Sequence, residues 1–267
     1  MLFLYNLPSA EMGALIVAAT LIVALAGYAL FRSFFPVRLD AEQRGMTIAM
    51  MSAVTTINSL LVAFSAISVW SSYQAASDNV AAEAACATEL SHDLAAFHAG
   101  QAYTARHDLG VYLQRVVRDE WPLMQQHASS DAGTEAAFDS MFAAVNQIEP
   151  SGDREHVLLS EVLTRVNEMV KYRQRRLQDL DSAMPVTLWG VMLLASGMSL
   201  VLLYALPGTR FNVVLVSIWA ITLGLAFFFV LAVDRPFAGE VSVGSEPMQR
   251  ALATLIAENP GQAGPPT

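Results

Sequence analysis

Polar side chains that could do chemistry gather on one apolar stretch of the chain, between Thr47 and Trp70. If this stretch is a helix, they fall on one face or directly beside it, because residues three, four and seven apart line up. The residues that we predict to line a pore are Ser52, Thr55, Asn58, Ser59, Val62, Ser65 and Val69. Such small, uncharged side chains could border a narrow path for ions. The alternative is that they mediate close packing and hydrogen bonds between helices.

Asn58 and Ser65 carry the sharpest form of this prediction, since they lie one heptad apart on nearly the same face. An amide in the middle of a bilayer costs free energy unless it meets water or a hydrogen-bond partner. In a symmetric ring of copies, the two residues would form two polar rings about 10 Å apart along the axis. We therefore expect cysteines at both positions to react with water-soluble thiol reagents.

Acidic residues follow the polar stretch, and no Lys or Arg occurs between Arg44 and Arg106. We predict that Asp78, Glu83 and Glu89 lie at the pore mouth. In a ring of identical chains their carboxylates would attract cations, which makes cations the expected ion. The alternative is an ordinary solvated face of a helical bundle.

A basic cluster, Lys171-Tyr-Arg-Gln-Arg-Arg176, lies shortly before the next apolar run. Its side chains could meet anionic lipid headgroups. We favour a second interpretation, in which the guanidinium groups pair with Asp or Glu inside the molecule.

The sequence contains no motif that predicts catalysis or metal binding. Glu89-Leu-Ser-His92 resembles the Glu-x-x-His ligand pair of di-iron bundles, but the sequence holds no second copy of it. A nucleophile elbow, a Gly-rich phosphate loop and zinc-ligand spacing are all missing from the sequence. We therefore expect neither an enzyme nor a bound metal or cofactor.

The composition is typical of a membrane protein with a sizeable polar part. Of 267 residues, 54% are hydrophobic and 15% are charged, against about 25% charged in globular proteins. A formal net charge of −9 argues against nucleic acid as a partner. The only cysteine is Cys86, so no disulfide can form within the chain.

The elements that must position these residues form an all-α polytopic membrane protein. We predict that the second span and the first helix of the polar part are one rod, Met46–Ala99, because it lacks Gly and Pro. Four apolar runs are long enough to cross a bilayer, and a helical bundle is inserted between the second and third. The predicted divisions are 1–70 for spans 1 and 2, 71–184 for the polar bundle, 185–233 for spans 3 and 4, and 234–267 for a motif, a short helix and a disordered tail. The helices expected in the bundle are the end of the rod, Ala102–Trp121, Thr134–Ile148 and Asp153–Ser182.

Several of these residues together resemble one known family. They are Glu83–Leu90, Tyr112, Glu120-Trp-Pro122, Arg173-x-x-Arg176-Leu, Pro185, Leu188-Trp189 and Asp234-Arg-Pro-Phe-Ala-Gly-Glu240. On this basis the chain resembles the bacterial bestrophin-like domain family, which is distantly similar to bestrophin ion channels. The resemblance implies a homopentamer in the bacterial inner membrane whose second spans line the pore. The sequence departs from bestrophins in that pore stretch, where Ser, Thr, Ala and Asn replace bulky apolar side chains.

The function that we expect is therefore a passive ion channel assembled from copies of this chain, with the bilayer and permeating ions as its other partners. The alternative is a non-conducting membrane sensor or scaffold that signals through the helical domain. Four spans place both termini and the polar domain on one side, and we expect that side to be the cytoplasm, although the positive-inside rule does not settle it.

The segment after the fourth span is expected to form a structural corner built from Asp234, Arg235, Pro236, Phe237 and Gly239. Pro236 would end the helix, Phe237 would anchor at the membrane interface, and Gly239 would allow the turn.

Overall fold

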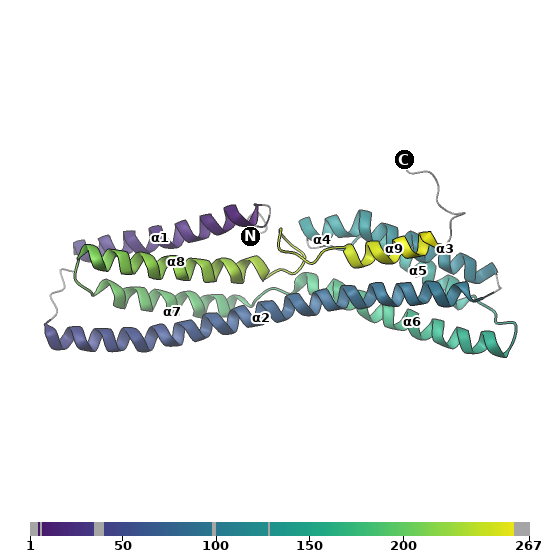
Figure 1. Cartoon of the computed structure of the whole chain (residues 1–267), viewed down its shortest axis with the longest axis horizontal. Coiled ribbons are helices and arrows are strands. Elements are labelled where there is room, and N and C mark those ends of the chain that lie inside the picture. The colour runs from purple at the N-terminus through teal and green to yellow at the C-terminus, as the bar shows by residue number, and fades with distance from the viewer. Residues whose placement is uncertain (1–4, 6, 35–39, 98–99, 128, 259–267) are drawn as a thin grey trace.

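The computed structural model describes residues 5, 7–34, 40–97, 100–127 and 129–258. Within these ranges it is helical and contains no strand (Figure 1). The α-helices are α1 (Ser9–Phe34), α2 (Ala41–Ala95), α3 (Gly100–Arg115), α4 (Trp121–His127), α5 (Ala132–Asn146), α6 (Asp153–Gln178), α7 (Val186–Tyr204), α8 (Arg210–Val233) and α9 (Glu246–Ala257). A π-helical turn, η2 (Val116–Glu120), precedes α4, and a 3-10 turn, η3 (Asp179–Asp181), follows α6.

The longest element is α2, whose 55 residues make a rod of about 80 Å. The rod begins five residues earlier than Met46, because Asp40 and Gln43 form a capping box around its first turn. Gln43 N–H donates to Asp40 Oδ1 at 2.7 Å, and Asp40 N–H donates to Gln43 Oε1 at 3.2 Å. Gly45 is thus inside the helix, where one glycine costs only about 1 kcal/mol. The predicted end at Ala99 lies outside the described residues; α2 ends at Ala95.

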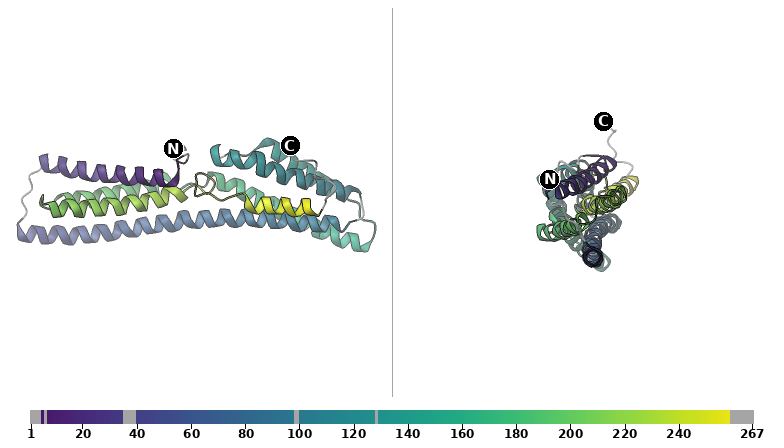
Figure 2. Two further views of the ribbon diagram at one scale, coloured as in Figure 1. Left: turned by 45° about the horizontal axis from the view of Figure 1, so that its top comes forward. Right: turned by 90° about the vertical axis from the view of Figure 1, so that its left-hand side faces the viewer.

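Four helices, α1, α2, α7 and α8, are long and apolar enough to cross a membrane. The first half of α2 lies beside α7 and α8, and α1 lies on the opposite side of these two helices, in an arrangement that we call the apolar bundle (Figures 1 and 2). α1 packs most extensively against α8, and α2 packs against α7 and α8. The close approach of α1 to α8 depends on Gly224, since a Cβ there would lie 2.9 Å from the backbone Cα of Val17.

The second half of α2 continues into what we call the polar bundle, together with α3 to α6 and α9 (Figure 1). There α2 packs against α6 and α9, while α3 packs against α5. The helix expected over Ala102–Trp121 is longer, because the backbone stays helical from Gly100 through Pro122 to His127, with η2 as a π-helical turn between α3 and α4. Pro122 lies inside this continuous helix, just after the π-helical turn. Asp131 caps α5 by accepting a 2.7 Å hydrogen bond from Thr134 N–H.

Candidate functional site

Three of the predicted pore residues on α2 face their own chain. Asn58, Ser65 and Val69 are 3%, 3% and 4% exposed. The Ser196 hydroxyl of α7 donates to Asn58 Oδ1 at 3.1 Å, and the Ser65 hydroxyl donates to the Leu61 carbonyl at 3.0 Å. Ser196 of α7 is therefore the hydrogen-bond partner that the Asn58 amide needs inside an apolar bundle. Because a single chain encloses no pore, the pore-lining role of these residues stays a prediction.

Three of the four remaining predicted pore residues border a groove between α2 and α8. Ser52 and Ser59 are exposed, whereas Thr55 and Val62 are half-buried. All of these except Ser52 line the groove, which has a volume of about 620 Å³. Asn58 also lines it, and within the described part of the chain its amide nitrogen donates no hydrogen bond. The groove thus combines an apolar surface with the amide nitrogen of Asn58, which has no acceptor among the described residues.

The three predicted mouth carboxylates have different environments. Asp78 is exposed. Glu89 is half-exposed and pairs with Arg165 of α6, with Nε to Oε2 at 2.9 Å. Glu83 is fully buried and its carboxylate is bound by Arg176. In this fold, therefore, the charge of Glu83 is neutralised inside the polar bundle, and only Asp78 and Glu89 can contribute to an acidic face.

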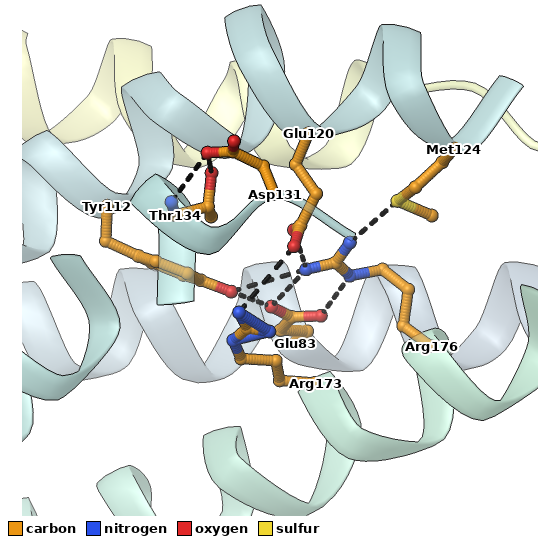
Figure 3. Close-up of polar contacts among 8 residues, drawn as sticks. All are labelled: Glu83, Tyr112, Glu120, Met124, Asp131, Thr134, Arg173 and Arg176. Atoms are coloured by element: carbon orange, nitrogen blue, oxygen red, sulfur yellow. Dashed lines mark hydrogen bonds and ion pairs between the residues drawn. The ribbon is translucent and has the colours of Figure 1, made fainter. Parts of the chain in front are cut away.

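Arg176 is the centre of a buried charge cluster in the polar bundle, which Figure 3 shows in close-up. Its Nε donates to Glu83 Oε2 at 2.7 Å, and its Nη2 donates to Glu120 Oε2 at 2.8 Å. A further nitrogen, Nη1, donates to Met124 Sδ at 3.0 Å. The Tyr112 hydroxyl donates to Glu83 Oε1. These contacts satisfy most donors of the guanidinium.

Arg173 completes the cluster and balances its charge. It lies one helical turn before Arg176 on α6, so both side chains leave the same face. Its Nη2 is 3.6 Å from Glu120 Oε1, and its guanidinium lies over the rings of Tyr112 and Phe138 at 5.7 and 5.3 Å. Two guanidinium groups thus face two carboxylates, which is the condition under which buried charges are tolerated.

Burial has opposite consequences for the pKa values of Tyr112 and Arg176. It raises the pKa of Tyr112 well above its ordinary value, as does the nearby Glu83 carboxylate, so the hydroxyl stays protonated and available as a donor. For Arg176, burial acts to lower the pKa, but Glu83 and the other acidic neighbours outweigh it and hold the pKa well above its usual value. Both groups therefore keep one protonation state across physiological pH.

The turn η2 is the local feature that brings Glu120 into the cluster. A π-helical turn holds one more residue than an α-helical turn and occurs often at functional sites. Here it ends with Glu120 directed at Arg176 and is followed by Trp121, whose ring lies 5.8 Å from the Arg176 guanidinium. Trp121 in turn meets Phe237 edge to face at 5.9 Å.

Phe237 connects the cluster to the segment that follows α8. We expected Phe237 at the membrane interface, but it is 2% exposed in the core of the polar bundle, where Trp121 supplies an aromatic partner. Asp234 Oδ1 accepts a 2.7 Å hydrogen bond from Met184 N–H, just before α7. Gly239 has a φ of +86°, which L side chains rarely adopt.

The same segment also reaches the start of α1 and includes the two other predicted corner residues. Glu240 Oε2 accepts a 2.6 Å hydrogen bond from Ser9 N–H at the N-terminus of α1. The carbonyl of Pro236 accepts a 2.7 Å bond from Val243 N–H, and that of Arg235 accepts one from Ala238 N–H at 3.2 Å. The segment 234–240 thus ties together α1, α8, the α6–α7 connection and α4. We call it the joint.

Cys86 is a poor candidate for chemistry. Burial, and then the charges of Glu168 and Glu89, raise the pKa of its thiol to about 11. Among the residues that the structure describes, no group of three or more His, Cys, Asp or Glu side chains is placed to hold a metal ion.

In a comparison with known families, the model of the Bestrophin-like domain matches residues 18–248. The chain belongs to the bestrophin-like family. Neither the curated proteins nor the solved structures yield a match.

The residues by which this bestrophin-like chain was recognised converge in space. Glu83, Tyr112, Glu120 and Arg176 form the buried charge cluster, and Trp121 and Phe237 link it to the joint. Sequence analysis predicted that the Lys171–Arg176 run pairs with carboxylates, and Arg173 and Arg176 do so. It did not identify Glu120 as their partner. The sequence offered little signal, because Glu120 directly follows Arg118 and Asp119 and is not distinguished from its acidic neighbour.

Proposed function

We propose that this bestrophin-like protein is a passive ion channel built from several copies of the chain, with α2 of each copy lining the pore. The proposal rests on the face of α2 that its own chain leaves uncovered. In a segment apolar enough to cross a membrane, that face carries Ser52, Thr56 and Ser59 as well as Ala63, and all four are exposed. Small hydroxyl side chains do not stabilise a helix surface that faces lipid, whereas a narrow pore needs small side chains that tolerate water.

The family context supports the same function. The Bestrophin-like domain suggests a distant relation to bestrophin ion channels, a group associated with channels and not with enzymes. A pentamer is the assembly that this relation favours. In our proposal, α1, α7, α8 and the first half of α2 cross the bacterial inner membrane, and the polar bundle lies in the cytoplasm.

We propose cations as the permeating ions. Asp78 and Glu89 lie on α2 beyond its apolar half, on a chain whose net charge is −9. In a ring of copies, these carboxylates would raise the local cation concentration at one mouth. Glu83 adds nothing to this effect, because Arg176 neutralises it.

The test is ion flux into liposomes that contain the purified protein, measured under separate potassium and chloride gradients. We expect flux under the potassium gradient. We expect a water-soluble thiosulfonate to block the Ser59→Cys variant, because the reagent would narrow the pore. The matched control is Ile22→Cys, which places a thiol on the exposed surface of α1. The native Cys86 is buried, with a thiol pKa of about 11, and does not interfere.

Each outcome has a definite consequence. Flux under the chloride gradient alone would overturn the cation proposal and leave the channel intact. An equal effect of the reagent on Ser59→Cys and Ile22→Cys would remove α2 from the pore. A stable oligomer with no flux under either gradient would favour the alternative, a membrane sensor or scaffold that uses the shared helix α2 to report movement.

A further inference from the structure

We infer that the groove between α2 and α8 is a docking site for the α2 helix of a neighbouring copy of this chain. The inference rests on the proposed function, because it states how the second spans would meet around a pore. The groove lies in the apolar bundle and is left open by the chain itself. An open groove at this depth is filled either by lipid tails or by a helix.

The occupant that fits the groove is present on the same helix. Four large apolar side chains of α2, Ile57, Leu60, Phe64 and Ile67, are 59%, 56%, 60% and 64% exposed. Their spacing of three, four and three residues places them in one row, which we call the ridge. The ridge projects from a different side of α2 than Asn58, Val62 and Ala66, which border the groove.

The ridge and the groove lie at the same level along α2. The ridge extends from Ile57 to Ile67, and the part of α2 that borders the groove extends from Thr55 to Ala66. In a ring whose axis runs along the helices, one protomer's contact surface must meet a different surface of the next protomer at the same height. A ridge and a groove on the same turns of one helix meet this requirement without any shift along the membrane.

The polar content of the groove favours a helix over lipid. Asn58 is only 3% exposed, and among the described residues its amide nitrogen, which lies at the groove wall, has no acceptor. Thr55 and Ser59 of α2 and Thr222 of α8 add hydroxyls to the same wall. A neighbouring helix can offer a carbonyl or hydroxyl oxygen to this donor, whereas a hydrocarbon tail offers none. Ala63 and Ala66 leave room for the large side chains of the ridge.

The same arrangement determines which face of α2 points at the ring axis. Between the ridge and the groove, going around the helix, lie Ser52 and Thr56, with Ser59 and Ala63 at the edge of the groove. When the ridge docks in the neighbour's groove, this strip of small side chains is left facing the axis. The docking therefore explains why the uncovered face of α2 is large and apolar on one side and small and hydroxylated on the other.

The experiment is cysteine cross-linking of the full chain in its native membrane. The double variant Leu60→Cys/Thr222→Cys places one thiol on the ridge and one in the groove. With an oxidant or a short bifunctional thiosulfonate, we expect a ladder of covalent oligomers larger than the dimer. Each single variant should stay monomeric, since ridge meets groove and not ridge. The control Ile22→Cys/Thr222→Cys, with one thiol on the exposed surface of α1, should also stay monomeric.

Two results would overturn the inference. Dimers from Leu60→Cys alone would mean that two ridges pack on each other in a two-fold pair. A monomeric double variant whose cysteines both react with a membrane-permeant maleimide would mean that the groove holds lipid. The flux assay separates this inference from the proposed function. A ladder without flux refutes the channel and leaves the docking standing, while flux without a ladder refutes only the docking.

Discussion

At the scale of single residues, the buried charge cluster is the most demanding feature of the molecule. Arg176 and Glu83 are both fully buried, so removing either partner would leave an uncompensated charge in a dry interior. The cluster avoids this cost by pairing two guanidinium groups with two carboxylates and by adding the Tyr112 hydroxyl as a further donor. Its members come from α2, α3, η2 and α6, so it also fixes how those elements pack (Figure 3).

Replacing Arg176 by methionine should therefore destabilise the protein strongly. Methionine keeps much of the volume but leaves Glu83 and Glu120 without their shared partner, a change that costs about 3–5 kcal/mol. We expect denaturant unfolding in detergent, followed by tryptophan fluorescence to which the adjacent Trp121 contributes, to shift to clearly lower denaturant concentration.

The matched control is Arg165→Met, which removes an arginine whose side chain is about one-third exposed and which pairs with Glu89 and Glu168 at the surface. Water screens such pairs, so this variant should unfold at nearly the wild-type denaturant concentration. Equal shifts for the two variants would show that the buried cluster adds no more than a surface ion pair.

At the scale of elements, local sequence patterns predicted most helices of the chain. The apolar runs predicted over Ser9–Phe31, Val186–Leu206 and Phe211–Val233 form α1, α7 and α8 within a few residues, because length and composition alone decide whether a helix can cross a membrane. The boundaries that were missed depended on single turns. The capping box of Asp40 moved the start of α2, and the helix of α3 continues through η2 and past Trp121 into α4.

The candidate site was harder to predict, because it depends on which face of α2 the other helices cover. Asn58 and Ser59 are neighbours in sequence, and both are polar, yet α7 buries the first and leaves the second exposed. Polar residues occur on more than one side of this helix, so periodicity alone could not separate the two faces. Glu83 illustrates the same point, since only tertiary packing brings Arg176 to it.

Gly224 provides a test of the packing between α1 and α8. A methyl group added there would clash with Thr20 Oγ1 and lie 2.9 Å from the backbone Cα of Val17. The hydroxyl can rotate away, but the backbone can move only if α1 moves, so Gly224→Ala should lower the unfolding temperature and the yield of folded protein. We would measure both by size-exclusion chromatography in detergent after heating.

Gly190 of α7 is the control for helix propensity. An added Cβ there meets nothing within 4 Å. Alanine is a better helix former than glycine by up to about 1 kcal/mol, so Gly190→Ala should leave the unfolding temperature unchanged or raise it. If Gly224→Ala behaved like Gly190→Ala, the α1–α8 contact would be looser than described here.

At the scale of the whole molecule, one helix is shared by two bundles that lie end to end (Figures 1 and 2). The joint at 234–240 is the second connection between them, since it binds Ser9 and Met184 near the apolar bundle and Trp121 in the polar bundle. A movement of either bundle must therefore act on α2, on the joint, or on both. This construction suits a protein in which a movement of the polar bundle changes the arrangement of the membrane-spanning helices, or the reverse.

The final prediction concerns how this two-bundle molecule lies across the membrane. Arg210 begins α8 at the end of the apolar bundle far from the polar bundle, and Ser140 is an exposed residue of α5 in the polar bundle. α8 has 24 residues, or about 36 Å of helix, enough to cross a hydrocarbon core of about 30 Å. An impermeant thiol reagent should therefore label Arg210→Cys and Ser140→Cys from opposite sides. In intact cells we expect labelling of Arg210→Cys alone, and labelling of Ser140→Cys after the membrane is permeabilised.

The wild-type chain, whose only thiol is the buried Cys86, is the background control. The reverse pattern would keep the two-bundle topology and place the polar bundle outside the cytoplasm. Labelling of both positions from one side would mean that α8 does not span the membrane.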